Sequence, residues 1–363
     1  MKIILSYAVE FDKGEGVHFD RVLRRLGHQV TSVSNSSHSG SSLGSAQVPL
    51  GFRPEVDLNK VVRQVGGADL FLYVEPLALI PYGLHCSPIP TACVISDVHR
   101  NLAARQTLSL LFDNVFLYQH SYLDKFTEHS AANLHWWPWS CDLTVFKDLG
   151  LPRDIDVAFI GQLFGAKSTR RRVLSKLATM VKINEQRRYL QSEIPETYSR
   201  AKIVINIPIG NDLNARVFEA MSCGAMLLTA KADGQDLLFR SSRHCVTYDG
   251  EADLLGKVRY YLAHEKERIA IAQAGHAEVL AQHSLELRLR ELLAKIASSP
   301  QRGAPARKFS TSRLLETYAS VHERSGNVDA LLALAARQEH LLNRLRLIRS
   351  GAKSLLRRVL LSW

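Results

Sequence analysis

The sequence has few cysteines, no long apolar run and no apparent targeting segment. Its five cysteines are odd in number and none has metal-ligand spacing, which favours free thiols in a reducing compartment. No stretch approaches the roughly 18 consecutive apolar residues that span a bilayer. Acidic residues follow the first apolar run too early for a signal peptide. We therefore expect a cytoplasmic protein without a transmembrane helix.

The sequence also lacks an even spread of charge. The net charge is +11, and residues 301–363 contribute +8 of it through twelve Lys or Arg and four Asp or Glu. The first 300 residues carry only +3. The basic character thus belongs to a C-terminal tail, and we expect no nucleic-acid partner.

Strand-like apolar runs alternate with helical patterns in two successive blocks. This alternation predicts parallel sheets covered on both faces, an α/β fold. We expect domains at 1–147 and 148–299, followed by a linker and basic helical tail at 300–363. Near the end of the second domain, the pattern predicts long helices over about 251–274 and 276–298. Periplasmic binding proteins and some dehydrogenases share such a two-domain architecture, so topology alone selects no function.

A motif-rich segment covers residues 195–239, PETYSRAKIVINIPIGNDLNARVFEAMSCGAMLLTAKADGQDLLF. It resembles the donor-binding core of GT-B glycosyltransferases, and more closely the group-1, spore-maturation-protein-B-like family. The positions that fit the family pattern are Tyr198, Lys202, Asn206, Arg216, Phe218, Glu219, Cys223, Gly224 and Thr229. Weaker similarity extends the resemblance to about residues 90–290. It implies two Rossmann-like domains facing a central cleft, with a helical C-terminal tail.

The resemblance also implies a nucleotide-sugar donor, which is a co-substrate, so no separate cofactor is expected. Glu219 would bind the ribose and Arg216 the phosphates, while Asn211 would lie in the loop facing the pyrophosphate or sugar. Many retaining relatives have a glutamate where Asn211 stands, so the stereochemistry of transfer stays open. Surface positions without any ligand are the alternative for Arg216 and Glu219.

A glycine and a basic stretch open the second domain. Gly161 would allow the donor phosphates close to the backbone, and one or more of the following basic residues would contact them. Lys167 and Arg171 are the candidates, although a basic helix face is more often simply solvated.

Asp97 and His99 follow a strand of the first domain. Ligands of parallel α/β sheets bind beyond the carboxyl ends of the strands. Asp97 is therefore the first candidate for the catalytic base and His99 the second. Asp97 could instead cap the next helix. For Trp136, Trp137 and Trp139, packing is favoured over sugar stacking.

The acceptor is open, and a glycan, a lipid-linked molecule or a protein would each fit. No metal site is expected, because the Asp-x-Asp motif of the other main glycosyltransferase fold is absent and basic residues would stabilise the leaving diphosphate. The alternatives are an inactive nucleotide-sugar-binding or interaction protein on the same scaffold, and a nucleotide-sugar epimerase.

The end of the tail, LLNRLRLIRSGAKSLLRRVLLSW, mixes apolar residues at helical spacing with Arg and Lys. Such a helix can lie on an anionic membrane surface, which would place the protein at the inner face of the membrane. The alternative is that the tail packs on the protein itself.

Overall fold

The computed structural model describes residues 1–7, 14–34, 57–75, 80–100, 102–127, 133–163, 168–300, 317–319 and 348–349. Contacts between residues divide the chain into two compact units. Unit 1 comprises residues 1–118, 122–137 and 292–363, and unit 2 comprises residues 119–121 and 138–291. Unit 2 includes Cys141 and Phe146, which are buried in the same apolar cluster as Val204. The domain bounds drawn from the sequence stay predictions.

Unit 1 contains a six-stranded, entirely parallel sheet in the order β2-β1-β3-β4-β5-β6. Its strands are β1 (Lys2–Tyr7), β2 (Gln29–Ser34), β3 (Leu70–Val74), β4 (Thr91–Ile95), β5 (Asn114–Leu117) and β6 (Asn133–Trp136). β1, β3, β4 and β5 are rich in Val, Ile, Leu and Phe and almost wholly buried, as expected when helices cover both faces of a parallel sheet.

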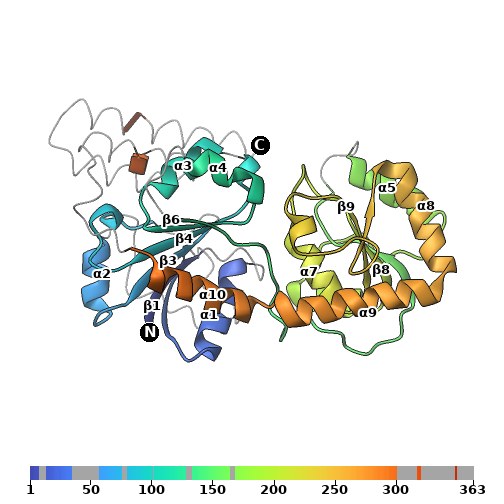
Figure 1. The fold of residues 1–363 in the computed structure, drawn as a ribbon, viewed down its shortest axis with the longest axis horizontal. Coiled ribbons are helices and arrows are strands. Elements are labelled where there is room, and N and C mark those ends of the chain that lie inside the picture. The colour runs from blue at the N-terminus through green and yellow to red at the C-terminus, as the bar shows by residue number, and fades with distance from the viewer. Residues whose placement is uncertain are drawn as a thin grey trace. The chain divides into compact units, whose positions relative to one another are not determined.

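Every second side chain of the central strands enters one apolar core. Phe71, Tyr73, Cys93 and Ile95 lie in one apolar cluster with residues of three helices of unit 1. These helices are α2 (Leu58–Gln64), α3 (Leu102–Ser109) and α4 (Leu123–Thr127), and a fourth, α1 (Glu15–Arg25), packs on β1 and β2. Figure 1 shows these helices around the sheet of unit 1.

The tryptophans at the end of this sheet are packing residues, as the sequence favoured. Trp137 is 1% exposed, and its ring lies 5.3 Å from the rings of Phe19 and Tyr118. Trp136 donates a hydrogen bond from its indole nitrogen to the carbonyl oxygen of Tyr118.

Unit 2 contains a four-stranded parallel sheet in the order β10-β9-β8-β7. Its strands are β7 (Ile155–Ala158), β8 (Ala201–Asn206), β9 (Met226–Ala230) and β10 (Val246–Tyr248). Its helices are α5 (Thr169–Ala178), α6 (Ile194–Ser199), α7 (Ala215–Ser222), α8 (Gly250–Ala263) and α9 (Glu265–Gln282), and α10 (Leu285–Ser298) begins there and ends in unit 1.

The two faces of this sheet are covered by different helices. Ile203 and Leu228 share a cluster with the buried side chains of α5 and α8. Their neighbours in sequence, Val204 and Leu227, share the other cluster with α7 and with Val279 of α9. In Figure 1, α5 and α8 accordingly flank β8 and β9 on the side away from α7. Short 3-10 turns connect the elements, namely η1 (Leu84–Cys86), η2 (Val98–Arg100), η3 (His120–Tyr122), η4 (Gln191–Glu193) and η5 (Gln235–Leu237).

The prediction of two long helices near residues 251–298 is wrong. The structure has three, α8 to α10, and the predicted break near Gly275 falls inside α9. A Cβ at Gly275 would collide with the carbonyl oxygen of His244, so this glycine lets α9 approach the loop before β10. The actual breaks lie at His264 and at His283–Ser284.

Most of the predicted tail lies outside the described residues, but residues 317–319 form part of a helix. Tyr318 is fully buried in the core of unit 1, with its ring 5.1 Å from that of Tyr82. The Tyr318 hydroxyl accepts a hydrogen bond of 3.0 Å from the backbone N–H of Leu84. This part of the tail is therefore bound to unit 1. No helix among the residues that the structure describes is long and apolar enough to cross a membrane.

Replacing Tyr318 by Ala should lower the free energy of unfolding by about 3 kcal/mol or more, because it empties a filled core position and leaves the Leu84 N–H unpaired. Urea unfolding of the full chain measures this change. Ile348→Ala is the control, because Ile348 belongs to the same tail but is 46% exposed. Equal stability of the two variants would show that the Tyr318 contact is absent in solution.

Candidate functional site

The carboxyl ends of β7 and β8 bring several polar groups together in unit 2. Parallel strands all end at the same edge of a sheet, where ligands of α/β proteins bind. β7 leads into Phe159, Ile160 and Gly161, and β8 ends at Asn206. The loop after β8 leads to α7, which begins at Ala215.

Arg216, in the first turn of α7, reaches across to both strand ends. Its Nε and Nη2 donate to the carbonyl oxygen of Ile160 at 2.9 and 2.6 Å, and its Nη1 donates to Oδ1 of Asn206 at 2.7 Å. The guanidinium lies over the ring of Phe159, 4.7 Å from its centroid. A Cβ at Gly161 would collide with this guanidinium, so the structure brings the two predicted residues Gly161 and Arg216 together.

Asn206 connects this arginine to the next strand and to the start of α7. The side chain is fully buried, and its Nδ2 donates to Oγ1 of Thr229 at 3.0 Å. Its Oδ1 also accepts from Asn214, which caps α7 by accepting from the Arg216 N–H. The family pattern included Asn206, but the sequence assigned it no role.

A second arginine, Arg170 of α5, lies at the same edge. It is 8% exposed, and its guanidinium donates to the carbonyl oxygens of Ile207 and Gln162. The group lies 5.4 Å from the centroid of the Phe159 ring. Burial, followed by the nearby charge of Arg216, lowers the pKa of Arg170 to about 10, so it stays charged at neutral pH.

The sequence did not identify Arg170 as the inward-pointing member of its basic stretch. Arg171 is exposed, and it lines a separate hollow of about 720 Å³ with Arg172, Leu163 and Gln186. The helix phase of α5 separates the two, since its buried positions are Arg170, Val173, Leu174 and Leu177. The spacing of these apolar residues was the feature of the sequence that could have identified Arg170 as the inward-pointing arginine. Lys167 lies outside the described residues.

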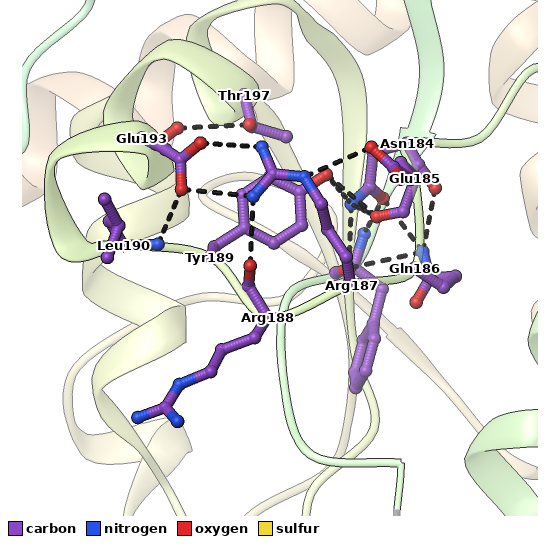
Figure 2. Close-up of polar contacts among 10 residues, drawn as sticks. Asn184, Glu185, Gln186, Arg187, Arg188, Tyr189, Leu190, Glu193 and Thr197 are labelled. Carbon is purple, nitrogen blue, oxygen red and sulfur yellow. Dashed lines mark hydrogen bonds and ion pairs between the residues drawn. The ribbon is translucent and has the colours of Figure 1, made fainter.

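The loop after residue 183 holds Phe159 in place. Asn184 Oδ1 accepts from the Phe159 N–H at 2.8 Å, and its Nδ2 donates to the Phe159 carbonyl at 3.1 Å. Figure 2 shows how the rest of the loop is fastened, with Arg187 paired to Glu193 at 2.7 Å and lying over the ring of Tyr189. The sheet edge under the two arginines is thus firmly fixed.

The other two predicted donor-binding residues, Glu219 and Asn211, belong to α7 and to the loop before it. Glu219 is the fifth residue of α7, one turn beyond Arg216, and is partly exposed. Its charge is close enough to contribute to the raised pKa of the buried thiols of Cys141 and Cys223, where burial is the larger cause. Asn211 is exposed in the loop before α7, and its carbonyl accepts from the Asp233 N–H at 3.2 Å.

In unit 1, Asp97 and His99 follow β4. Asp97 has a positive φ of 48°, uncommon for a residue other than glycine, and His99 is exposed in η2. Next to them lies a carboxyl that the sequence did not single out, Glu75 at the end of β3. Burial is the main cause that raises its pKa to about 7. Its position directly after a buried strand was the signal, as for Asp97.

No group of three or more His, Cys, Asp or Glu that could hold a metal ion occurs in the part of the chain that the structure describes. Independence from metal stays a prediction.

Comparison with known proteins supports this arrangement of elements. Residues 149–294 match the family described as Glycosyl transferase-like. No curated protein sequence matches the chain significantly. Several solved structures are similar at low sequence identity.

Sucrose-phosphate synthase from Thermosynechococcus elongatus is one of these structures. It is 12% identical, with a TM-score of 0.59 over 82% of this chain and 99% of that one. A glycosyltransferase from Rickettsia africae is 11% identical, with a TM-score of 0.56 over 83% and 99%. The Anabaena protein HepE, solved with UDP and glucose, is 14% identical, with a TM-score of 0.56 over 82% and 100%.

The chain has the GT-B fold. The prediction of this fold class is therefore confirmed. The GT-B glycosyltransferase resemblance is supported as well, while the finer spore-maturation-protein-B-like resemblance stays a prediction.

Asn206→Ala should destabilise unit 2 by about 2–3 kcal/mol, because a partly buried arginine and the buried Thr229 hydroxyl each lose one hydrogen-bond partner. Urea unfolding followed by circular dichroism measures the loss. Asn133→Ala is the control, since Asn133 is only partly buried and its side chain donates a long 3.3 Å bond to Asn114. An equal effect of both changes would contradict the connecting role of Asn206.

Proposed function

We propose that this GT-B protein is a glycosyltransferase that moves a sugar from a nucleotide-sugar donor bound by unit 2. The observation that carries the proposal is the convergence of Arg170 and Arg216 on Phe159 at the carboxyl edge of the sheet. The family matched by residues 149–294 and the GT-B neighbours support the same activity.

The two guanidiniums make this edge suitable for a diphosphate. They donate to carbonyl oxygens, which fix the orientation of both groups. Arg216 lowers the pKa of Arg170, so the two positive charges repel each other, and an anion between them would relieve that repulsion. The first N–H groups of α7 add positive potential there. These groups would stabilise the diphosphate as it leaves.

The remaining donor contacts follow from position. Glu219 would accept hydrogen bonds from the ribose hydroxyls, and Asn211 would contact the pyrophosphate or the sugar. Gly161 keeps space beside Arg216 that a side chain would fill. Lys167 and Arg171 stay proposed phosphate contacts. The structures of HepE and of an α-glucosyltransferase contain UDP-glucose, which makes UDP-glucose the first donor to try.

The acceptor would bind on unit 1, where Asp97 and His99 are the proposed acceptor-side residues. A glycan, a lipid-linked molecule or a protein would each offer the required hydroxyl. Cytoplasmic location and peripheral membrane contact through the basic tail remain part of the proposal, and a membrane contact would suit a lipid-linked acceptor.

Arg170→Met should weaken UDP binding by about tenfold to a hundredfold, because a charge-assisted bond contributes about 1.5–3 kcal/mol. Isothermal titration calorimetry with UDP measures the affinity, and release of UDP from UDP-glucose measures turnover. Arg172→Met is the matched control two residues further along α5, since Arg172 is exposed and paired with Glu251. If Arg170→Met does not fold, Arg216→Gln replaces it.

Several outcomes of that experiment differ in meaning. A wild-type protein that binds neither UDP nor other nucleoside diphosphates would overturn the proposal in favour of an interaction protein. Tight binding without turnover of any nucleotide sugar would favour the inactive binding protein. If the control variant Arg172→Met binds UDP as weakly as Arg170→Met does, the assigned phosphate site is wrong.

Glu219→Gln should lower UDP affinity by about tenfold while leaving the melting temperature unchanged, because an amide is a weaker acceptor for two ribose hydroxyls than a carboxylate. Comparing UDP with 2′,3′-dideoxy-UDP in both proteins isolates the ribose contact. The variant should lose its preference for UDP, whereas an unchanged preference would place the ribose elsewhere.

A further inference from the structure

Two carboxyl groups lie together where neighbouring strands of unit 1 end. β3 and β4 pair in parallel, and Glu75 is the first residue after β3 while Asp97 is the second after β4. The Glu75 N–H continues the ladder by donating to the carbonyl oxygen of Val94 at 3.0 Å. Glu75 is thereby fixed by the sheet itself, whereas Asp97 lies beyond the end of its strand and has a positive φ.

Arg105 of α3 holds the Glu75 carboxyl in one orientation. Its Nε donates to Glu75 Oε2 at 3.2 Å and to the carbonyl oxygen of Ser96 at 2.9 Å. Both side chains of this ion pair are 12% exposed. The carboxyl is therefore largely withdrawn from water, oriented, and still open to solvent at its edge.

The charged and titratable groups around Glu75 come from three elements. Burial is the largest influence on its pKa and raises it, Arg105 from α3 lowers it, and Asp97 beyond β4 raises it. Tyr73 of β3 and Cys93 of β4 are fully buried, and each has a pKa raised by burial and by Glu75. The result is a pKa of about 7, at which a carboxylate is a far stronger base than one in water.

We infer that Glu75, rather than Asp97, is the proton acceptor of the transfer reaction, with Arg105 as its positioning residue and Asp97 as a neighbouring negative charge. The inference rests on the proposed glycosyltransferase function and assigns a role within it. It follows from the position of Glu75 at the carboxyl edge of the sheet, its burial and its bond to Arg105.

The step balances without any further reactant. The hydroxyl oxygen of the acceptor forms a bond to the anomeric carbon of the donor sugar, and its proton passes to the Glu75 carboxylate. The bond from the anomeric carbon to the phosphate oxygen breaks, and the diphosphate leaves with the electron pair. Water can take the place of the acceptor, so hydrolysis of the donor follows the same course.

The charged neighbours of Glu75 allow a test, because removing each of them should shift the pH dependence of the reaction in a known direction. The rate of UDP-glucose hydrolysis should rise with pH and level off above about 7, because the protonated carboxyl cannot accept a proton. Glu75→Gln should lower the plateau rate by about 10²–10⁴-fold and remove the rise. Asp97→Asn removes a negative neighbour and should move the midpoint to lower pH. Arg105→Gln removes a positive one and should move it to higher pH.

Controls separate this role from a structural one. UDP affinity and melting temperature should be the same in Glu75→Gln and the wild type, and Asp124→Asn, at an exposed carboxyl of α4, should change nothing. A carboxyl ¹³C NMR titration of the free protein gives a second measurement. The resonance lost in Glu75→Gln should titrate near pH 7, even where no sugar nucleotide is turned over.

The opposite results are equally clear. If Asp97→Asn abolishes the pH-dependent rise and Glu75→Gln keeps it, Asp97 is the base and the inference fails. A Glu75 resonance that titrates near pH 4.5 also overturns it. A wild-type protein that binds no nucleoside diphosphate overturns the proposed function first, and the role of Glu75 with it.

Discussion

Two like charges held side by side, those of Arg170 and Arg216, are the constraint on which the carboxyl edge of the unit 2 sheet depends. Arg170 and Arg216 would separate if water or acidic side chains alone decided their positions. Carbonyl oxygens at the ends of β7 and β8 keep them over one phenyl ring. Asn206, Asn184 and the absence of a side chain at Gly161 all serve that arrangement. The two charges give this edge a positive electrostatic potential, and an anion bound there would reduce the repulsion between them.

The two units hold groups of opposite charge at the same edge of a parallel sheet, the edge where the strands end. In unit 2, the guanidiniums of Arg170 and Arg216 are held by carbonyl oxygens. In unit 1, a carboxyl is enclosed with one arginine and one further carboxyl, and its charge is made costly by burial. Carbonyl dipoles and burial thus place a pair of cations at one edge and a carboxyl with a raised pKa at the other.

Features of this fold and site that depend on neighbouring residues can be predicted from the sequence, whereas those that depend on residues far apart in it cannot. Strand positions follow from short apolar runs, and the GT-B motif around Arg216 and Glu219 follows from local residue patterns. The inward direction of Arg170 depends on the helix phase of α5, which starts at a cap on Ser168. The state of Glu75 depends on Arg105, thirty positions away in the sequence, and on burial, neither of which a local pattern contains. Gly275 shows the same limit, because its partner is the backbone of His244.

The burial of Tyr318 has a consequence for chain connectivity. Within unit 1, α10 ends at Ser298 and Thr317 is again buried, so both ends of the intervening segment are fixed to the folded protein. That segment closes a loop, whose entropic cost depends only weakly on its length. A single backbone cut within it would turn the docking of Tyr318 from an intramolecular contact into a bimolecular association. Retention of the C-terminal fragment would then depend on protein concentration, and fragments could exchange between molecules.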